Sequence, residues 1–292
     1  PVVALIGLEL AGSAASTAGL LDEQIDMRNV IVFLVTLGVA VFGQILFRGF
    51  LSVIPILIAI ICGYIAGVIT GVIDTQTIVD ALHTSFISIP NFQTPKFDIN
   101  AILIILPVIL VIANEHIGHQ LVTSKVVGRD LLKDPGLHRS LFADNFSTMI
   151  SGFIGSVPTT TYGENIGVMA ITKVYSVRVI GGAAVISIIC SFVGPLAALI
   201  QTIPGPVIGG ISFLLYGMIG TSGLRILVDN HVDYSKNRNM ILTSVIFVTG
   251  LSGVTLSLGD VSLSGMTLAA IVAMIMSLVF HALDRAKLTN DV

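Results

Sequence analysis

The sequence predicts an all-α polytopic membrane protein in which some of the membrane helices are broken. Its residues are 54% hydrophobic and only 11% charged, whereas soluble domains carry about 25% charged residues. The mean hydropathy is +0.98, and long apolar stretches alternate with short polar connections. Both cysteines, Cys62 and Cys190, lie in apolar stretches and are interpreted as buried side chains without a disulfide.

The apolar stretches define the candidate membrane spans, since a helix needs about 20 mostly apolar residues to cross a bilayer. The spans are residues 2–20, 29–47, 51–73, 100–122, 144–157, 164–175, 178–202, 206–226, 239–257 and 263–283. The segments 144–157 and 164–175 are too short to cross alone. They are predicted to be two half-helices.

The basic residues give the orientation, because lysine and arginine collect on the cytoplasmic side. If each segment counts as one pass, only Arg28 and Lys96 fall on one side of the membrane. The other side receives Arg48, Lys125, Arg129, Lys133, Arg139, Lys173, Arg178, Arg225, Lys236, Arg238, Arg285 and Lys287. That side is predicted to be cytoplasmic, together with the C-terminus.

Two distant segments indicate an internal repeat. Residues 1–20 read PVVALIGLELAGSAASTAGL, and residues 206–224 read PVIGGISFLLYGMIGTSGL. Pro1, Val2, Ile6, Leu10 and Gly12 align with Pro206, Val207, Ile211, Leu215 and Gly217, and one gap aligns Gly19 with Gly223. The two segments start on opposite sides of the membrane, so the repeat is inverted, as in many secondary transporters. Chance resemblance between apolar helices is the alternative. The first repeat shows only its second part, so we expect roughly a hundred residues ahead of Pro1.

Ionisable residues inside the spans are candidates for function, because they are costly in lipid. They are Glu9, Glu115, His116, His119 and Glu164. Glu115 and His119 are four residues apart, on one helix face. Such a pair can share a proton, which suits proton coupling; a purely structural pair is the alternative. The order Glu-His-x-x-His differs from the His-Glu-x-x-His of zinc proteases, so no metal site is expected.

The stretch TTTYGENIG, residues 159–167, is the most polar part of the apolar region. Pro158 ends the preceding helix, and the threonines favour extended backbone. We therefore predict a half-helix at 144–157, an extended segment at about 158–162 and a second half-helix at 164–175. Glu164 and Asn165 then lie at a helix start, where free N–H donors and a carboxylate suit a small ligand with alternating C=O and N–H groups. The alternative is that Glu164 only caps its own helix.

The motifs NEHIGH, DPGLHRSLFADNFSTMISGFIGSVPTTTYGENIGVMAITKVYS and IGGISFLLYGMIG together resemble the nucleobase–cation symporter-2 (nucleobase-ascorbate transporter) family, and within it the bacterial uracil:proton symporters. The resemblance runs from Pro1 almost to the C-terminus. The family signature is matched here by Glu164, Asn165, Gly167, Thr172 and Lys173.

The resemblance implies fourteen helices in two inverted repeats of seven, divided into a core domain and a gate domain. This chain would begin at the fifth helix. Residues 1–74 would be gate helices, 75–98 an outer connection, 99–203 half of the core domain with the substrate site, and 204–292 further gate helices with the cytoplasmic C-terminus.

The resemblance also implies roles for individual residues. Glu115 and Glu164 would bind the N–H groups of a pyrimidine ring, with Tyr162 and Gly163 contributing from the extended segment. His119, with Glu115, would couple the proton, and Tyr216 would be a gate contact. The implied function is proton-coupled uracil uptake across the bacterial cytoplasmic membrane. The partners would be the nucleobase, the lipid bilayer and a second copy bound through the gate helices, with no cofactor, nucleic acid or enzymatic activity.

Several alternatives remain open at the level of sequence. A purine or xanthine permease of the same family is one, although Glu164 favours uracil. A sulfate-type anion transporter would be expected to present basic or neutral groups at the half-helix start, so Glu164 disfavours it. A non-transporting truncated subunit is the third.

Overall fold

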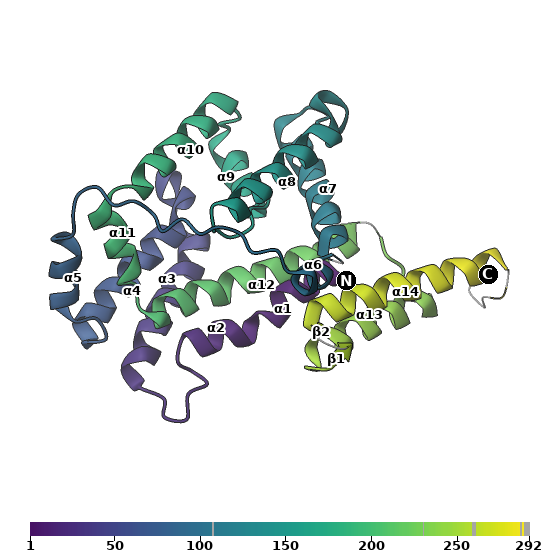
Figure 1. Ribbon diagram of the computed structural model, residues 1–292, viewed down its shortest axis with the longest axis horizontal. Helices are drawn as coiled ribbons and strands as arrows, with labels where there is room; N and C mark the ends of the chain where they lie inside the picture. The colour runs from purple at the N-terminus through teal and green to yellow at the C-terminus, as the bar shows by residue number, and fades with distance from the viewer. Residues whose placement is uncertain (107, 230, 259–260, 287, 289–292) are drawn as a thin grey trace. The chain divides into compact units, whose positions relative to one another are not determined.

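The computed structural model describes residues 1–106, 108–229, 231–258, 261–286 and 288 (Figure 1). These residues form two compact units. Unit 1 comprises residues 1–12, 96–118 and 215–292, and unit 2 comprises residues 13–95 and 119–214. Each unit is described by itself.

Each predicted span contains one or two helices, so the chain is a mostly helical membrane protein. In order they are α1 (Val2–Glu9) and α2 (Ala11–Thr17), α3 (Met27–Leu46), α4 (Pro55–Thr70), α6 (Ile99–Ile105) and α7 (Val108–Val127), α8 (Leu137–Phe153), α9 (Gly163–Thr172), α10 (Val177–Ser191) and α11 (Gly194–Gln201), α12 (Gly205–Asp229), α13 (Asn237–Leu251) and α14 (Gly265–Arg285). Within the described residues, α3, α12 and α14 are long and apolar enough to cross a membrane.

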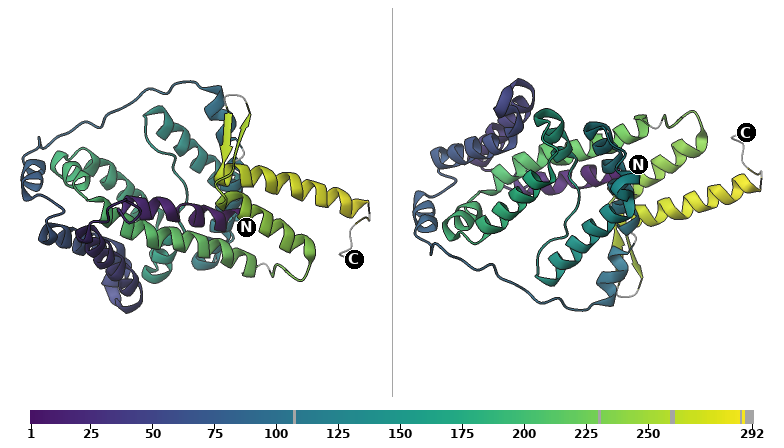
Figure 2. Two further views of the ribbon diagram at one scale, coloured as in Figure 1. Left: turned by 90° about the horizontal axis from the view of Figure 1, so that it is seen from below. Right: turned by 90° about the horizontal axis from the view of Figure 1, so that it is seen from above.

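The structure also contains elements that the span prediction lacks. They are the helix α5 (Thr75–Leu82), the short turns η1 (Gly49–Val53) and η2 (Leu132–Gly136), and the strands β1 (Thr255–Leu258) and β2 (Val261–Ser264). The strands pair antiparallel with Thr255 opposite Ser264. This hairpin leads directly into α14 (Figure 2).

Unit 1 is built around α1, which packs against α13 and α14. Leu5, Ile246 and Ala269 form its buried cluster. At the end of α1, the Glu9 carboxylate accepts a hydrogen bond of 2.7 Å from the Met266 backbone N–H. Since the first N–H groups of a helix have no partner within it, Glu9 caps α14.

In unit 2, α3 packs against α4, and Gly209 in the first part of α12 lies against Ala14 of α2 and against Ala18, which directly follows α2. The connection 75–98 is fastened to this unit at several points. Helix α5 contacts α11, the Ser88 N–H donates to the Phe192 carbonyl at 2.9 Å, and the Gln93 N–H donates to the Ile154 carbonyl at 3.2 Å.

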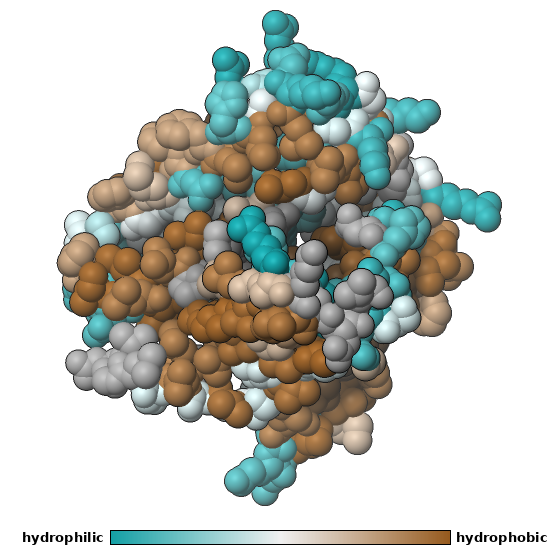
Figure 3. Space-filling view, turned by 90° about the vertical axis from the view of Figure 1, so that its right-hand side faces the viewer, coloured by the Kyte–Doolittle hydropathy of each residue, from teal (hydrophilic) through white to brown (hydrophobic). Residues whose placement is uncertain are grey.

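Apolar side chains cover much of the surface, as Figure 3 shows for one face. Helix α10 has no buried residue, and Val177 at its start is 83% exposed. Large exposed apolar surfaces mark contact with membrane or protein. This distribution agrees with a chain that folds within a bilayer.

Candidate functional site

The candidate site is built on a break between α8 and α9. Helix α8 ends at Phe153, residues 156–162 have no regular secondary structure, and α9 begins at Gly163. The predicted bounds of the first half-helix, 144–157, were wrong: it runs over 137–153. It stops early because Gly155 takes a left-handed φ of +80°, and Pro158 then disfavours helical backbone at Val157.

The second half-helix is also shorter than predicted, with 163–172 in place of 164–175. Lys173 takes a left-handed φ of 54° and caps α9 through its N–H, which donates to the Met169 carbonyl at 2.8 Å. The Thr172 hydroxyl donates to the Val168 carbonyl at 2.9 Å. Of these two signature residues, Lys173 terminates the helix and Thr172 bonds within its last turn.

The start of α9 presents backbone donors. Tyr162 is the N-cap residue in extended conformation, with φ −106° and ψ 122°, and its side chain makes no capping hydrogen bond. The backbone of Glu164 lies in the first turn, where the helix dipole favours negative charge, but its side chain lies outside the described part of the structure. The predicted role of Glu164 in ligand binding stays a prediction.

His119 of α7 contacts the segment that leads into α9. Its Nδ1 lies 2.8 Å from the Thr161 hydroxyl, within hydrogen-bond distance. Its Nε2 lies 3.3 Å from the position that a Cβ on Gly163 would occupy. A side chain at position 163 would therefore crowd the imidazole. The structure thus brings His119, Thr161 and Gly163 together.

The remaining predicted residues are placed as follows. Tyr162 is 59% exposed, and Asn165 and Gly167 are exposed on α9. Glu115 and Tyr216 belong to unit 1, whereas His119 and the broken segment belong to unit 2. The predicted contacts of Glu115 and Tyr216 with the broken segment therefore stay predictions.

Comparison with known proteins identifies the family. A model described as "Permease family" matches residues 1–259. The chain belongs to this family. The chain is 54% identical over 286 residues to the uracil permease of Escherichia coli strain K12, and the match covers 97% of this chain and 66% of that protein.

Other similar proteins are also named as permeases. The uracil permease of Paenibacillus larvae is 49% identical over 296 residues, which cover 99% of this chain and 70% of that protein. A putative pyrimidine permease of Escherichia coli strain K12 is 37% identical over 281 residues, which cover 94% of this chain and 62% of that protein. The chain thus spans about two thirds of the length of the curated relatives that it matches. The resemblance that the sequence motifs predicted is confirmed.

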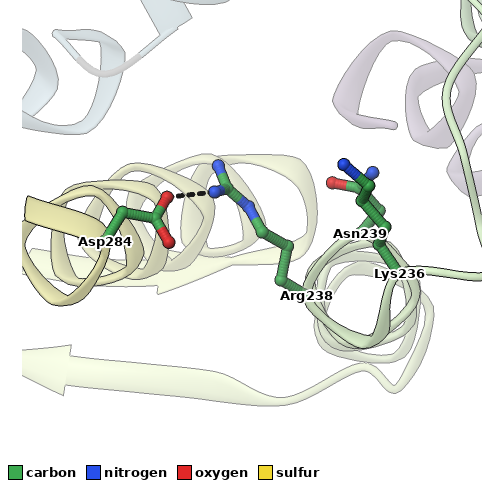
Figure 4. Close-up of a pocket in the computed structure, with 4 residues that line it drawn as sticks. All are labelled: Lys236, Arg238, Asn239 and Asp284. Carbon is green, nitrogen blue, oxygen red and sulfur yellow. Dashed lines mark hydrogen bonds and ion pairs between the residues drawn. The ribbon is translucent and has the colours of Figure 1, made fainter. Parts of the chain in front are cut away.

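Unit 1 carries a surface pocket whose lining includes none of the predicted site residues. It is lined by Lys236, Arg238, Asn239 and Asp284, and Arg238 points across it to form an ion pair with Asp284 (Figure 4). The Asp284 carboxylate of α14 thus neutralises the Arg238 guanidinium of α13. Because this ion pair joins the start of α13 to the end of α14, we interpret it as structural.

Two features of the site are not predicted from the sequence. The threonine-rich pattern predicts only extended backbone at Thr161, but the Thr161 hydroxyl contacts His119. Ser147, Thr148 and Ser151 of α8 bond to the broken segment. The spacing of these three hydroxyls, on one face of a helix just before a break, was the available signal. Among the described residues, no group of three His, Cys, Asp or Glu side chains gathers in a way that could hold a metal ion.

Proposed function

We propose that this permease carries uracil into the cell together with a proton. The observation that carries the proposal is the contact between His119 and Thr161 at 2.8 Å, directly before the start of α9. A histidine is the side chain whose charge changes most readily near neutral pH. His119 contacts the Thr161 hydroxyl, two residues before the N–H donors at the start of α9. Protonation of His119 can therefore affect ligand binding, and ligand binding can affect protonation.

The choice of uracil rests on the relatives and on chemistry. The relatives named above carry the names uracil permease and putative pyrimidine permease. A pyrimidine-dione ring presents alternating C=O and N–H groups. The uncapped N–H groups of the first turn of α9 suit the carbonyls, and carboxylates at Glu115 and Glu164 would accept from the ring N–H groups.

In the proposed cycle, the Glu115–His119 pair takes up a proton on the outer side and favours the substrate-bound state. The core half, about 99–203, then moves relative to the gate helices, 1–74 and 204–287. Uracil and proton are released on the cytoplasmic side. Transport of the two is coupled because the bound proton raises the affinity for the substrate, and the bound substrate raises the affinity for the proton.

An inverted repeat would supply the two alternating arrangements, and matched contacts support it. In unit 1, a Cβ on Gly223 would overlap the backbone of Ala4, so these two residues pack directly. In unit 2, a Cβ on Gly209 would lie 2.6 Å from the Ala18 Cβ. Gly209 is the aligned counterpart of Ala4, and Ala18 directly precedes the counterpart of Gly223. Within each unit, then, one repeat copy contacts the other at aligned or adjacent positions, which supports the proposed repeat.

Uptake of radiolabelled uracil tests the proposal. The complete coding sequence for this chain would be expressed in bacterial cells that lack their own uracil carrier. We expect uptake that increases with external acidity, collapses with a protonophore, and is lost in Glu164→Ala. Persistent uptake in Glu164→Ala at the wild-type rate would refute the site assignment.

Competition separates uracil from other substrates. Excess unlabelled uracil should suppress uptake, while excess xanthine or adenine should not. Suppression by xanthine at equal concentration would instead make the protein a purine permease.

His119→Gln, which keeps a polar side chain without the titrating ring, should retain uracil binding but lose the dependence of uptake on pH.

A further inference from the structure

The last turns of α8 present three hydroxyl groups to the broken segment. Ser147, Thr148 and Ser151 are spaced i, i+1 and i+4, which places them along one side of the helix. The Thr148 hydroxyl donates to the Thr159 carbonyl at 2.7 Å, and the Ser151 hydroxyl donates to the Val157 carbonyl. The Thr159 hydroxyl in turn donates to the Ser147 hydroxyl at 2.9 Å. We call Ser147, Thr148 and Ser151 the hydroxyl ladder.

Thr148 satisfies both backbone groups of one residue. Its Oγ1 donates to the Thr159 carbonyl and also lies 3.3 Å from the Thr159 N–H, from which it accepts. A hydroxyl has one donor and two lone pairs, so it can do both at once. In a sheet, the residue opposite on a neighbouring strand would exchange these two bonds. The side chain of Thr148 therefore gives Thr159 the two hydrogen bonds that a residue on a partner strand would give it.

The hydrogen bonds from Thr148 matter because the broken segment lies between two half-helices that are predicted to lie in the membrane. Backbone N–H and C=O groups that lack water must be satisfied within the protein, and each unsatisfied group is costly. The stretch from Val157 to Thr161 receives no helical hydrogen bonds, since it lies between α8 and α9. The hydroxyl ladder holds its first half, and the contact of Thr161 with His119 holds its second half. The Thr161 attachment comes immediately before Tyr162 and Gly163, and the ladder attachments at Val157 and Thr159 lie a few residues earlier.

We propose that the hydroxyl ladder positions the broken segment, so that the start of α9 is held ready for the substrate. The inference rests on the proposed function and assigns Ser147, Thr148 and Ser151 as positioning residues that act through Thr159 and Val157. Without the ladder the segment can leave α8, and the donors of α9 lose their fixed direction. Substrate affinity then falls, while the proton-coupling histidine stays intact.

The test compares Thr148→Val with Thr148→Ser in the complete protein. Valine keeps the shape of threonine but removes the hydroxyl, whereas serine keeps the hydroxyl. Hydrogen–deuterium exchange of peptides that cover residues 157–162 reports directly on the Thr159 N–H. Thr148→Val should speed this exchange roughly 2- to 10-fold and raise the KM for uracil more than it changes kcat. In Thr148→Ser, the exchange rate at residues 157–162 and the KM for uracil should both stay close to those of the wild type.

A matched control is Thr221→Val on α12, where the hydroxyl donates only to carbonyls of its own helix, at 3.1 Å and 3.0 Å. It should change neither exchange at 157–162 nor the KM for uracil. If Thr148→Val does not fold, Ser151→Ala serves as the second variant, because its hydroxyl bonds to the Val157 carbonyl.

Unchanged exchange in Thr148→Val and Ser151→Ala would overturn the ladder. Faster exchange with an unchanged KM for uracil would overturn its positioning role. A wild-type protein that carries no uracil would refute the proposed function, and the exchange measurement would still decide whether the hydroxyls hold the segment.

Discussion

At the scale of single residues, polar side chains in this protein mainly complete the hydrogen bonds of the backbone. Glu9 accepts from the Met266 N–H at the start of α14, Asp26 accepts from the Arg28 N–H at the start of α3, and Thr148 serves both backbone groups of Thr159. In an apolar setting, an uncompensated backbone group costs more than a polar side chain that satisfies it. The positions of these three polar residues can therefore be explained by the backbone atoms that they serve.

Asp26 provides a pH-dependent prediction outside the spans. The hydrogen bonds from Arg28 hold the pKa of the Asp26 carboxyl below its ordinary value of 3.8. A lowered pKa means that the carboxylate stabilises the folded state at pH values above 3.8, and that this contribution disappears as pH falls through the lowered pKa. Asp26→Asn keeps an N-cap oxygen but not the charge.

We expect the Tm of wild type in detergent to exceed that of Asp26→Asn near neutral pH, with a small difference because the group is exposed. The difference should shrink as the pH approaches the lowered pKa. A difference that grows on acidification would contradict the assignment.

Glu9 yields a second prediction at this scale. Loss of an N-cap acceptor typically costs about 0.5–2 kcal/mol, so Glu9→Ala should lower the Tm measured by thermal unfolding. Glu9→Gln retains an acceptor oxygen and should lose less. The control is Glu23→Ala in the exposed connection before α3, which should leave the Tm unchanged; equal losses in both alanine variants would exclude the capping role.

At the scale of elements, helices of unit 1 approach closely where they carry small residues. Gly223 of α12 faces the Ala4 backbone with no room for a Cβ, and Gly250 of α13 faces the Leu5 side chain in the same way. Small residues at helix contacts allow this approach within membranes. The packing of α1 between its neighbours therefore depends on the absence of particular side-chain atoms.

Gly223→Ala should destabilise the protein, because overpacking typically costs about 1–3 kcal/mol. This cost outweighs the gain of up to about 1 kcal/mol in helix propensity. Gly217→Ala on the same helix is the matched control, since no described atom lies within 4 Å of its Cβ position. The Tm should fall for the first variant and hold or rise for the second; the reverse order would contradict the contact.

The sequence predicted where helices occur better than where they end. Apolar periodicity located the α8 region, but its first turns, from Leu137, are amphipathic rather than apolar and were assigned to a loop. The predicted helix at 178–202 divides at Val193, which forms an isolated bridge with Ile87. The pair Gly194-Pro195 at the start of α11 is a local signal for this boundary, whereas the bridge to Ile87 depends on a distant segment that local patterns do not report. The hairpin before α14 was missed because its eight paired residues lie within or beside apolar spans.

The candidate site was predictable in part. The break followed from Pro158 and the Thr-rich stretch, and the i, i+4 spacing to Glu115 singled out His119, whose role stays a prediction. The contact with Thr161 did not follow from the sequence, because α7 and the broken segment are 42 positions apart at this point. The hydroxyl ladder was missed because serine and threonine are common in helices, where they bond to their own carbonyls. Only the fold shows which hydroxyls reach another segment.

At the scale of the whole molecule, the distribution of basic residues predicts the orientation. With Arg285 and Lys236 on the cytoplasmic side, a fluorescent protein fused to the C-terminus should fluoresce in cells, and alkaline phosphatase fused there should be inactive. Fusions in the connection 84–98 should give the opposite pair of results. An active C-terminal phosphatase would invert the predicted topology and with it the direction of the proposed cycle.

The connection 75–98 has a consequence for engineering the protein. Its backbone is anchored at Ser88 to Phe192 and at Gln93 to Ile154, and a chain can span only a limited distance per residue. A deletion between Ser88 and Gln93 would therefore pull on the end of α8 and on the bend between α10 and α11. The same deletion after Thr94 lies beyond both anchors and puts no strain on either of them. A stretch that looks like a spare surface loop thus has a minimum length between its two anchors, whereas added residues there would only lengthen the loop.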